Sequence, residues 1–130
     1  MNYLLDTHIW VWSQDESHRL GRRVQRVLND PRSELWLSPM SMVEFGMLDR
    51  KHKFNLKEPA QTWLPKATAA LHEAVMTNEV ALASHRYLTV LKDPADRIIA
   101  ATAAVYGLCL ITADGLIGGL KDIEVLDNDD

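Results

Sequence analysis

Cysteine is nearly absent from this chain: its 130 residues include only one, Cys109. A disulfide framework and a zinc site built from several cysteines are therefore excluded. No apolar run reaches the roughly 18 residues that a membrane-spanning helix needs. The first residues also carry no basic region and no cleavage-like site of a secretory signal. From these absences we expect a cytoplasmic protein without membrane contact.

Flexible linkers and repeats are also missing, since the 6 glycines and 5 prolines are scattered and form no low-complexity tract. The 47% hydrophobic and 25% charged residues are typical of a soluble globular protein. A chain of this length buries roughly two-thirds of the surface that its unfolded form exposes, which is enough for a core without a structural metal. We therefore expect a single domain over residues 1–130.

Negative charge is concentrated near the C-terminus. The formal net charge is -4, from 14 basic and 18 acidic residues. Residues 122–130 contain five of the acids and no base, so residues 1–121 carry 14 bases against 13 acids. Eight of the bases lie in two short segments: Arg19, Arg22, Arg23 and Arg26, then Arg50, Lys51, Lys53 and Lys57. A nucleic-acid partner is therefore compatible with the negative net charge.

Hydrophobic periodicity divides the chain into alternating strands and helices. The predicted strands cover residues 3–5, 34–37, 108–111 and, with weaker patterns, 73–76 and 123–126. The predicted helices cover residues 8–12, 18–28 with Ser17 as the cap, 39–50, 60–71, 79–85 and 94–106. This alternation predicts an α/β fold with a central, mostly parallel sheet flanked by helices on both faces. Functional sites in such folds lie at the carboxyl ends of the strands.

Four acidic residues are predicted to meet at that edge of the sheet. Asp6 and Asp114 each follow directly after an apolar strand, and Asp96 lies in the first turn of the helix opened by Asp93. Glu44 interrupts an otherwise apolar helix. Taken singly, the aspartates could cap helices, which is the preferred interpretation of Asp93, and Glu44 could face solvent. Their convergence favours a functional site, because capping gives them no common reason to meet.

Such a cluster of carboxylates needs a cation. Two like charges ~4 Å apart repel by about 4 kcal/mol at an effective dielectric constant near 20, and a divalent ion reverses that sign. Oxygen ligands without histidine or thiolate favour Mg²⁺ or Mn²⁺ over Zn²⁺. Magnesium keeps several water molecules, so one of them can act as a nucleophile while the metal neutralises charge on a phosphoryl oxygen. The residues therefore predict metal-assisted hydrolysis of a phosphodiester.

Four short motifs contain these acids. They are, in chain order, Asp6-Thr7-His8, Ser38-x-x-Ser41-x-x-Glu44, Asp93-Pro94-Ala95-Asp96-Arg97 followed by Ile-Ile-Ala-Ala-Thr-Ala, and Thr112-Ala113-Asp114. These motifs resemble those of PIN-domain proteins, and more closely those of VapC-type toxin ribonucleases of type II toxin–antitoxin systems. Each motif is short, but the four in this order and at these separations are specific. The resemblance covers residues 2–114 and implies a PIN-like three-layer sandwich.

The resemblance implies an endoribonuclease that cuts RNA with Mg²⁺ or Mn²⁺, forms a homodimer and is silenced by a cognate VapB-type antitoxin. By position, the implied catalytic residues are Asp6, Glu44, Asp96 and Asp114. The metal ligands among them are Asp6, Asp96 and Asp114. Glu44 is expected to bind the metal through water or to position the attacking water. Thr112 and Ser41 are supporting residues, and Thr112 is expected to orient a carboxylate by a hydrogen bond.

The chain departs from the family pattern at Ala95, where a bulky residue is common, and at Gly115, where a basic residue is common. These departures are expected to affect how the substrate is bound beside Asp114 and which surface contacts a second copy of the chain or the antitoxin. Contacts to RNA are expected at Arg50, Lys51 and Lys53. The arginines of residues 19–26 lie opposite an apolar stripe, which is typical of a solvated face. Core or interface packing is favoured over base stacking for the four tryptophans, which are Trp10, Trp12, Trp36 and Trp63.

Other functions fit the residues less well. A phospho-acceptor receiver domain needs a second acid beside the first and a lysine after a late strand, but Thr7 follows Asp6 and no lysine directly follows Ile111. A haloacid-dehalogenase-like phosphatase needs an aspartate two residues after its nucleophile, where this chain has His8. Two alternatives stay open: a PIN-fold scaffold that binds RNA or a protein without cutting, and a housekeeping nuclease without a toxin role.

Overall fold

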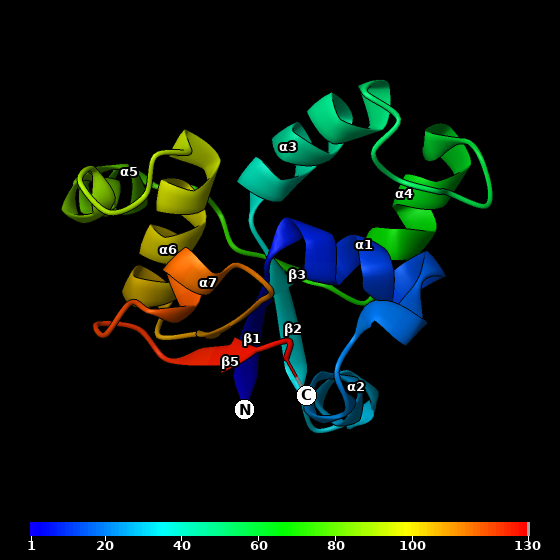
Figure 1. The fold of residues 1–130 in the computed structure, drawn as a ribbon, viewed down its shortest axis with the longest axis horizontal. Coiled ribbons are helices and arrows are strands. Elements are labelled where there is room, and N and C mark those ends of the chain that lie inside the picture. Colours follow the sequence, from blue (N-terminus) through cyan, green and yellow to red (C-terminus); the bar gives the residue numbers. More distant parts are fainter. Residues whose placement is uncertain (130) are drawn as a thin grey trace.

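A sheet of five parallel strands forms the centre of the structure, a computed structural model that describes residues 1–129 (Figure 1). Asp130, the last acid of the C-terminal stretch, lies outside the described residues. The strands are β1 (Asn2–Leu5), β2 (Glu34–Leu37), β3 (His72–Glu73), β4 (Cys109–Thr112) and β5 (Val125–Asp127). Their order is β3-β2-β1-β4-β5, and all four neighbouring pairs are parallel. The central β1 therefore pairs with both β2 and β4.

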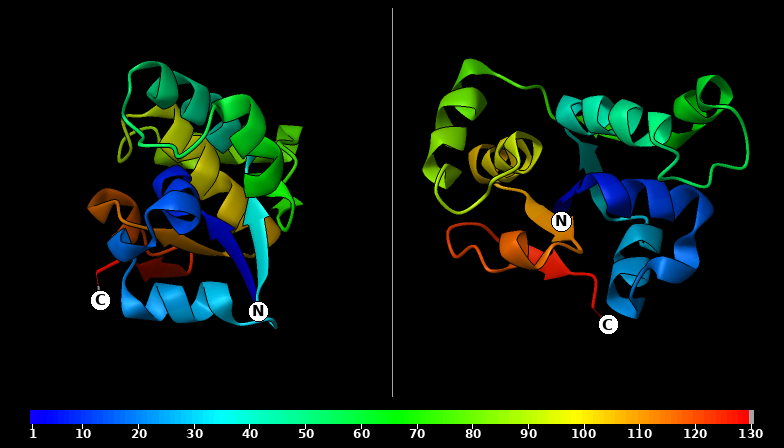
Figure 2. Two further views of the ribbon diagram at one scale, coloured as in Figure 1. Left: turned by 90° about the vertical axis from the view of Figure 1, so that its right-hand side faces the viewer. Right: turned by 45° about the horizontal axis from the view of Figure 1, so that its top comes forward.

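Helices cover both faces of this sheet. They are α1 (Thr7–Asp15), α2 (Arg22–Asn29), α3 (Pro39–Arg50), α4 (Ala60–Thr68), α5 (Asn78–Ala83), α6 (Pro94–Tyr106) and α7 (Gly115–Gly118). Two 3-10 turns, Ser17–Arg19 and Ser84–Tyr87, precede α2 and follow α5. In Figures 1 and 2, α5 and α6 lie on one side of the strands, and α1, α2 and α4 lie on the other. The predicted α/β architecture is confirmed.

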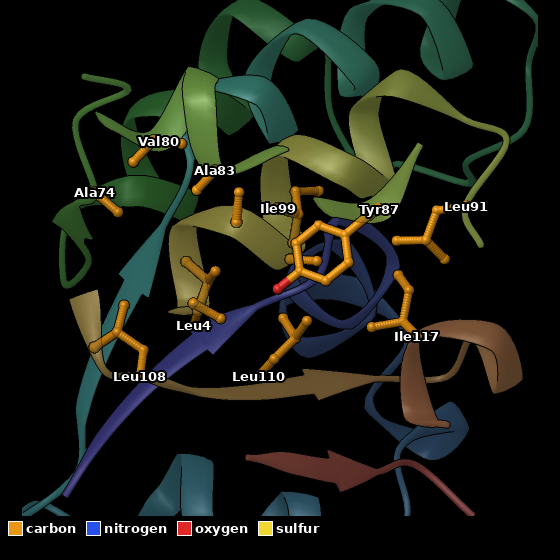
Figure 3. Packing of buried hydrophobic residues seen from close by; sticks show 13 residues of the cluster. Leu4, Ala74, Val80, Ala83, Tyr87, Leu91, Ile99, Leu108, Leu110 and Ile117 are labelled. Atoms are coloured by element: carbon orange, nitrogen blue, oxygen red, sulfur yellow. The ribbon is translucent and has the colours of Figure 1, made fainter. Parts of the chain in front are cut away.

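Alternation along the central strands creates two hydrophobic cores. Leu4 and Leu110 lie side by side in the register of β1 and β4 and belong to the core shown in Figure 3, where they lie beneath Ile99 of α6. The next residues, Leu5 and Ile111, belong to the second core, on the other face. All four of these side chains are almost fully buried. Because successive side chains of a strand point to opposite faces, both helix layers are anchored to the same two strands.

Polar side chains at the helix starts determine where the chain leaves the sheet. Each of the following accepts a hydrogen bond from a backbone N–H of the helix it precedes: Asp6, Ser38, Thr77, Asp93 and Asp114. Proline occupies the first helical position after Ser38 and Asp93, where its missing N–H is not needed. The predicted starts of α3 and α6 are therefore confirmed.

The helix predicted over residues 18–28 with Ser17 as its cap is wrong in its first turn. Ser17 begins a 3-10 turn, and α2 starts only at Arg22, with Gly21 as its cap. The side chain of Asn128 holds this break: its Oδ1 accepts the Gly21 N–H at 2.7 Å, and its Nδ2 donates to the Arg19 carbonyl at 2.9 Å. Asn128 is 107 positions beyond Gly21, so no local pattern predicts the break.

Smaller differences concern the weak patterns. The strand predicted over residues 73–76 is the two-residue β3, and the one predicted over 123–126 is β5, which begins at Val125. The short α7 was not predicted, whereas α4 contains Pro65 without ending there. Within residues 1–129, no helix combines the length and the apolar character that crossing a membrane requires.

Candidate active site

The four predicted acids line one cleft at the carboxyl edge of the sheet. Its volume is about 620 Å³. It is lined by Asp6, His8, Trp12, Arg19, Glu44, Leu48, Lys53, Asp93, Asp96, Ala113 and Asp114. The acids come from the end of β1, the middle of α3, the start of α6 and the residues after β4, so segments far apart in the sequence meet here.

Asp6 is the most buried of these carboxylates, with 7% of its surface exposed. Its Oδ1 accepts the Thr7 N–H at 2.8 Å, which caps α1, and its Oδ2 accepts the Thr112 hydroxyl at 2.6 Å. Its own N–H donates to the Ile111 carbonyl at 3.0 Å. Burial raises the pKa of the Asp6 carboxyl group, the hydrogen bonds from Thr112 and Thr7 oppose this rise, and repulsion from Asp114 adds to it.

Thr112 joins Asp6 to Asp114. Its hydroxyl donates to Asp6 and accepts the N–H of Asp114 at 3.0 Å, and its side chain is fully buried. Asp114 Oδ1 accepts the N–H groups of Leu116 and Ile117 at 2.8 and 3.3 Å, which caps α7. The carboxylate of Asp114 is therefore oriented by the short helix that follows it.

A second group of carboxylates adjoins the first. One carboxylate oxygen from each of Glu44, Asp93 and Asp96 lies within 4.8 Å of the other two. Asp93 was interpreted as a helix cap, and its Oδ1 does accept the Ala95 N–H at 2.9 Å. It also belongs to this acidic group, a position that our sequence analysis missed. The spacing of three residues between Asp93 and Asp96 on one first helical turn is the signal that indicates it.

Ser41 connects the helix of Glu44 to the helix that follows Asp6. Its hydroxyl is hydrogen-bonded to that of Thr7 at 2.9 Å, and both residues are fully buried. Because Ser41 lies one helical turn before Glu44, this contact sets the position of that turn of α3 relative to α1. Burial raises the pKa of Glu44, and a hydrogen bond with the Thr7 side chain opposes the rise.

Four neighbouring carboxylates repel that of Asp96. Its half-burial, with repulsion from the carboxylates of Asp6, Asp93, Asp114 and Glu44, raises the pKa of Asp96 to about 7. A divalent cation would remove this repulsion. Carboxylate oxygens on rigid helix starts are suitable ligands for a hard divalent cation, and no cysteine lines the cleft among residues 1–129. The donor set therefore fits a divalent metal.

The cationic residues are distributed differently from our expectation. Lys53 lines the cleft together with Arg19, which was assigned to a solvated face. In the described part of the chain, Arg50 and Lys51 are not among the lining residues. Trp10 and Trp63 are buried in the core, in agreement with the packing interpretation, and Trp12 lines the cleft.

Comparisons with known proteins agree with this architecture. The family model described as PIN domain matches residues 3–118. Ribonuclease VapC22 of Mycobacterium tuberculosis is 31% identical over 116 residues, which cover 85% of each chain.

Solved structures of low sequence identity share the fold. VapBC2 from Rickettsia felis, bound to a DNA fragment from its promoter, has a TM-score of 0.76 at 17% identity and covers 99% of this chain and 100% of that chain. DNA-bound VapBC from Salmonella typhimurium has a TM-score of 0.71 at 18% identity, over 98% of both chains. VapBC-1 from nontypeable Haemophilus influenzae has a TM-score of 0.70 at 19% identity, over 98% of both chains.

Proposed function

This chain belongs to the PIN domain family and is similar to a VapC ribonuclease, and on that premise we propose that it is a metal-dependent endoribonuclease, the toxin of a type II toxin–antitoxin pair. One observation carries the proposal: five carboxylates from four separate segments line one cleft. Without a cation such a cluster is unfavourable, as the raised pKa of Asp96 indicates. Helix capping explains the positions of Asp6, Asp93 and Asp114 singly but not their convergence on one cleft, whereas such a group of carboxylates can hold the divalent metal that promotes phosphodiester hydrolysis.

In this proposal Asp6, Asp96 and Asp114 hold Mg²⁺ or Mn²⁺, and Asp93 adds a further carboxylate next to those of Asp96 and Glu44. Thr112 keeps the Asp6 carboxylate in place through its 2.6 Å hydrogen bond. A bound divalent ion would supply positive charge at the phosphoryl oxygens and lower the pKa of a nearby water.

Glu44 is the group that accepts a proton in this reaction. It is half-buried and its pKa is raised by burial, which brings its basicity closer to that needed at neutral pH. The attacking water gives its proton to the Glu44 carboxylate while its oxygen bonds to phosphorus. The bond from phosphorus to the ribose oxygen breaks, and the leaving oxygen takes a proton from solvent water. Thr7 and Ser41 keep Glu44 in position on α3.

The partners follow from the same assignment. A VapB-type antitoxin is the proposed inhibitor, supported by the toxin–antitoxin complexes that share this fold. We assign RNA contacts to Lys53 in the cleft and to Arg50 and Lys51 at the nearby end of α3. A homodimer is supported by apolar side chains of α3 that face solvent, since Val43 and Met47 are 54% and 55% exposed. All of these functions belong to one domain, residues 1–130.

The test is cleavage of RNA by the purified chain, freed of antitoxin. We expect cleavage with Mg²⁺ or Mn²⁺ and none after addition of a chelator. Removing a residue that merely hydrogen-bonds to a metal ligand lowers metal affinity or activity roughly 10–100-fold. Replacing a ligand itself should cost more, so we expect Asp6→Asn and Asp96→Asn each to lower the cleavage rate by at least about 100-fold. Asp30→Asn is the matched control, because Asp30 pairs with Arg32 on the surface away from the cleft. Cleavage that persists in chelator or in both cleft variants would overturn the assignment.

A further inference from the structure

The cleft contains a second group of residues that the proposed reaction does not use. His8, Trp12 and Arg19 line it together with the acids. The rings of His8 and Trp12, one helical turn apart on α1, have centroids 5.6 Å apart, and the Arg19 guanidinium carbon lies 5.3 Å from the Trp12 ring centroid. Phe54 also packs against His8: the centroids of the two rings are 5.5 Å apart, in an edge-to-face arrangement. We call these four residues the aromatic–cationic row.

The aromatic–cationic row is anchored by ring contacts that connect Phe54 to buried residues of the core. Phe54 stacks on Phe45 at 5.7 Å, and Phe45 stacks on the buried Trp63 at 5.0 Å. The Trp63 indole N–H donates to Asp15 Oδ2 at 3.0 Å, and the same oxygen accepts the Lys57 N–H at 3.2 Å. Asp15 thus ties the loop that carries Phe54 to the end of α1. Pre-organised rings lose little conformational freedom when a ligand binds.

Arg19 is also oriented but stays accessible. Its Nε lies 3.7 Å from Glu16 Oε2, and its side chain is 52% exposed. The guanidinium is therefore placed between a carboxylate and the Trp12 ring, with enough exposure to reach a further anion. A planar guanidinium can stack on an aromatic ring and bind a phosphate with its remaining N–H groups.

We propose that Trp12 and Arg19 form a nucleotide subsite next to the carboxylate cluster, in which the base packs against the Trp12 and His8 rings and the adjoining phosphate binds Arg19. The inference rests on the proposed function in that the ligand is the RNA to be cut. Aromatic side chains bind bases by stacking, and arginine supplies both stacking and charge. Arg19 also adds to the positive charge that Lys53 brings to this cleft of carboxylates, and a chain of net charge -4 needs such local positive charge to bind a polyanion.

The experiment measures binding, so that it is independent of cleavage. Asp96→Asn serves as the parent because it should not cut the probe. The probes are a fluorescein-labelled ten-nucleotide single-stranded RNA of mixed sequence and an abasic ribose-phosphate chain of equal length, followed by anisotropy. Trp12→Leu should weaken RNA binding about 5-fold to 150-fold, the range for loss of one stacked base, and leave binding of the abasic chain unchanged. Trp12→Phe should stay within about threefold of the parent, because the stacking ring is kept.

Arg19→Gln tests the phosphate contact. It should weaken binding of both probes and reduce the salt dependence of log K by about 0.7, the value for one phosphate of a single strand. Arg22→Gln is the matched control, since Arg22 is exposed on α2 and does not line the cleft, and it should change neither quantity. Circular dichroism of each variant confirms that the fold is kept.

Three results would overturn the subsite: parent protein that binds no RNA, Trp12→Leu with unchanged RNA affinity, or equal weakening of RNA and abasic chain by Trp12→Leu, which indicates a structural role. The proposed function fails in a different way. If the wild-type chain does not cut RNA with any divalent metal, but binding still depends on Trp12 and bases, the ribonuclease assignment is wrong and the subsite stands.

Discussion

The two oxygens of the Asp6 carboxyl group have different partners, one in the helix that follows and one in a strand 106 residues away. Capping and cleft formation are therefore not alternatives for this residue, and the same holds for Asp93 and Asp114. A carboxylate that caps α1 or α6 is placed at the positive end of a helix dipole, which stabilises its charge. A capping hydrogen bond at Asp6, Asp93 or Asp114 therefore does not argue against a role in the cleft.

The pKa of Asp96 predicts how the metal-free protein responds to pH. In the folded protein the pKa of Asp96 is about 7, whereas in the unfolded chain the pKa of this carboxyl group is its ordinary 3.8. The stability it contributes is therefore complete below pH 3.8 and is lost as the pH rises through about 7. We expect the thermal midpoint in chelator to fall between about pH 4 and pH 7.

The control is Asp96→Asn, which has no such proton, so the fall over this pH range should be smaller than in the wild-type chain. Excess Mn²⁺ should raise the wild-type midpoint more at pH 8 than at pH 5, because the metal binds the ionised carboxylates. Thermal denaturation followed by circular dichroism measures all of these quantities. An identical slope in the variant would show that Asp96 does not titrate in this range.

At the scale of the element, α3 and α6 were the most predictable parts of the chain. Ser38-Pro39 and Asp93-Pro94 are local signals, and the structure starts both helices at these prolines. The end of α6 is equally local, since Gly107 adopts a left-handed conformation with φ of 68°. Where a boundary depends on a distant partner, as at Gly21 with Asn128, the local pattern was misleading.

We expect replacement by alanine to have opposite effects on stability at Gly46 in α3 and at Gly107, which ends α6; both glycines are exposed to solvent. Gly107→Ala should destabilise the protein by about 1–2 kcal/mol, because a Cβ is unfavourable in the left-handed region. Gly46→Ala, inside α3, should stabilise it by about 0.5–1 kcal/mol, because alanine is the better helix former. Neither added Cβ would meet another atom within 4 Å, so packing does not obscure the comparison. Urea denaturation measures both, and effects of the same sign would contradict the explanation.

At the scale of the whole molecule, the strand order brings the site together. Placing β4 beside β1 puts Thr112 next to Asp6, and the crossover through α6 places Asp93 and Asp96 above the same edge. A hydrophobic core lies on either face of β1 and β4, so that β4 is buried along its whole length and Leu4 and Leu5 of β1 are almost fully buried. Because the same β1–β4 pairing positions Asp6 and Thr112, the geometry of the site depends on the stability of these two cores.

Leu110→Ala tests that dependence. Leu110 is fully buried in β4, and its truncation should lower the free energy of unfolding by about 2–5 kcal/mol. Leu82→Ala is the control, since Leu82 is 68% exposed on α5 and its truncation should change stability by less than about 0.5 kcal/mol. Chemical denaturation gives both values, and a small effect at Leu110 would indicate that β4 is not part of the cooperative core.

The sequence by itself determined the α/β class, the starts of α3 and α6, and the candidate acids Asp6, Asp96 and Asp114, which follow strands or lie at a helix start, because hydrophobic period and capping chemistry act over a few residues. It also singled out Glu44 as the acid that interrupts an apolar helix. Only the tertiary structure decided that Asp93 joins the acids, that Arg19 and Trp12 face the cleft while Arg50 and Lys51 do not line it, and that Asn128 interrupts a helix. These outcomes depend on which side chains meet after the sheet has formed. Contacts between residues about a hundred positions apart, such as that of Asn128 with Gly21, cannot be predicted from any short segment of the sequence.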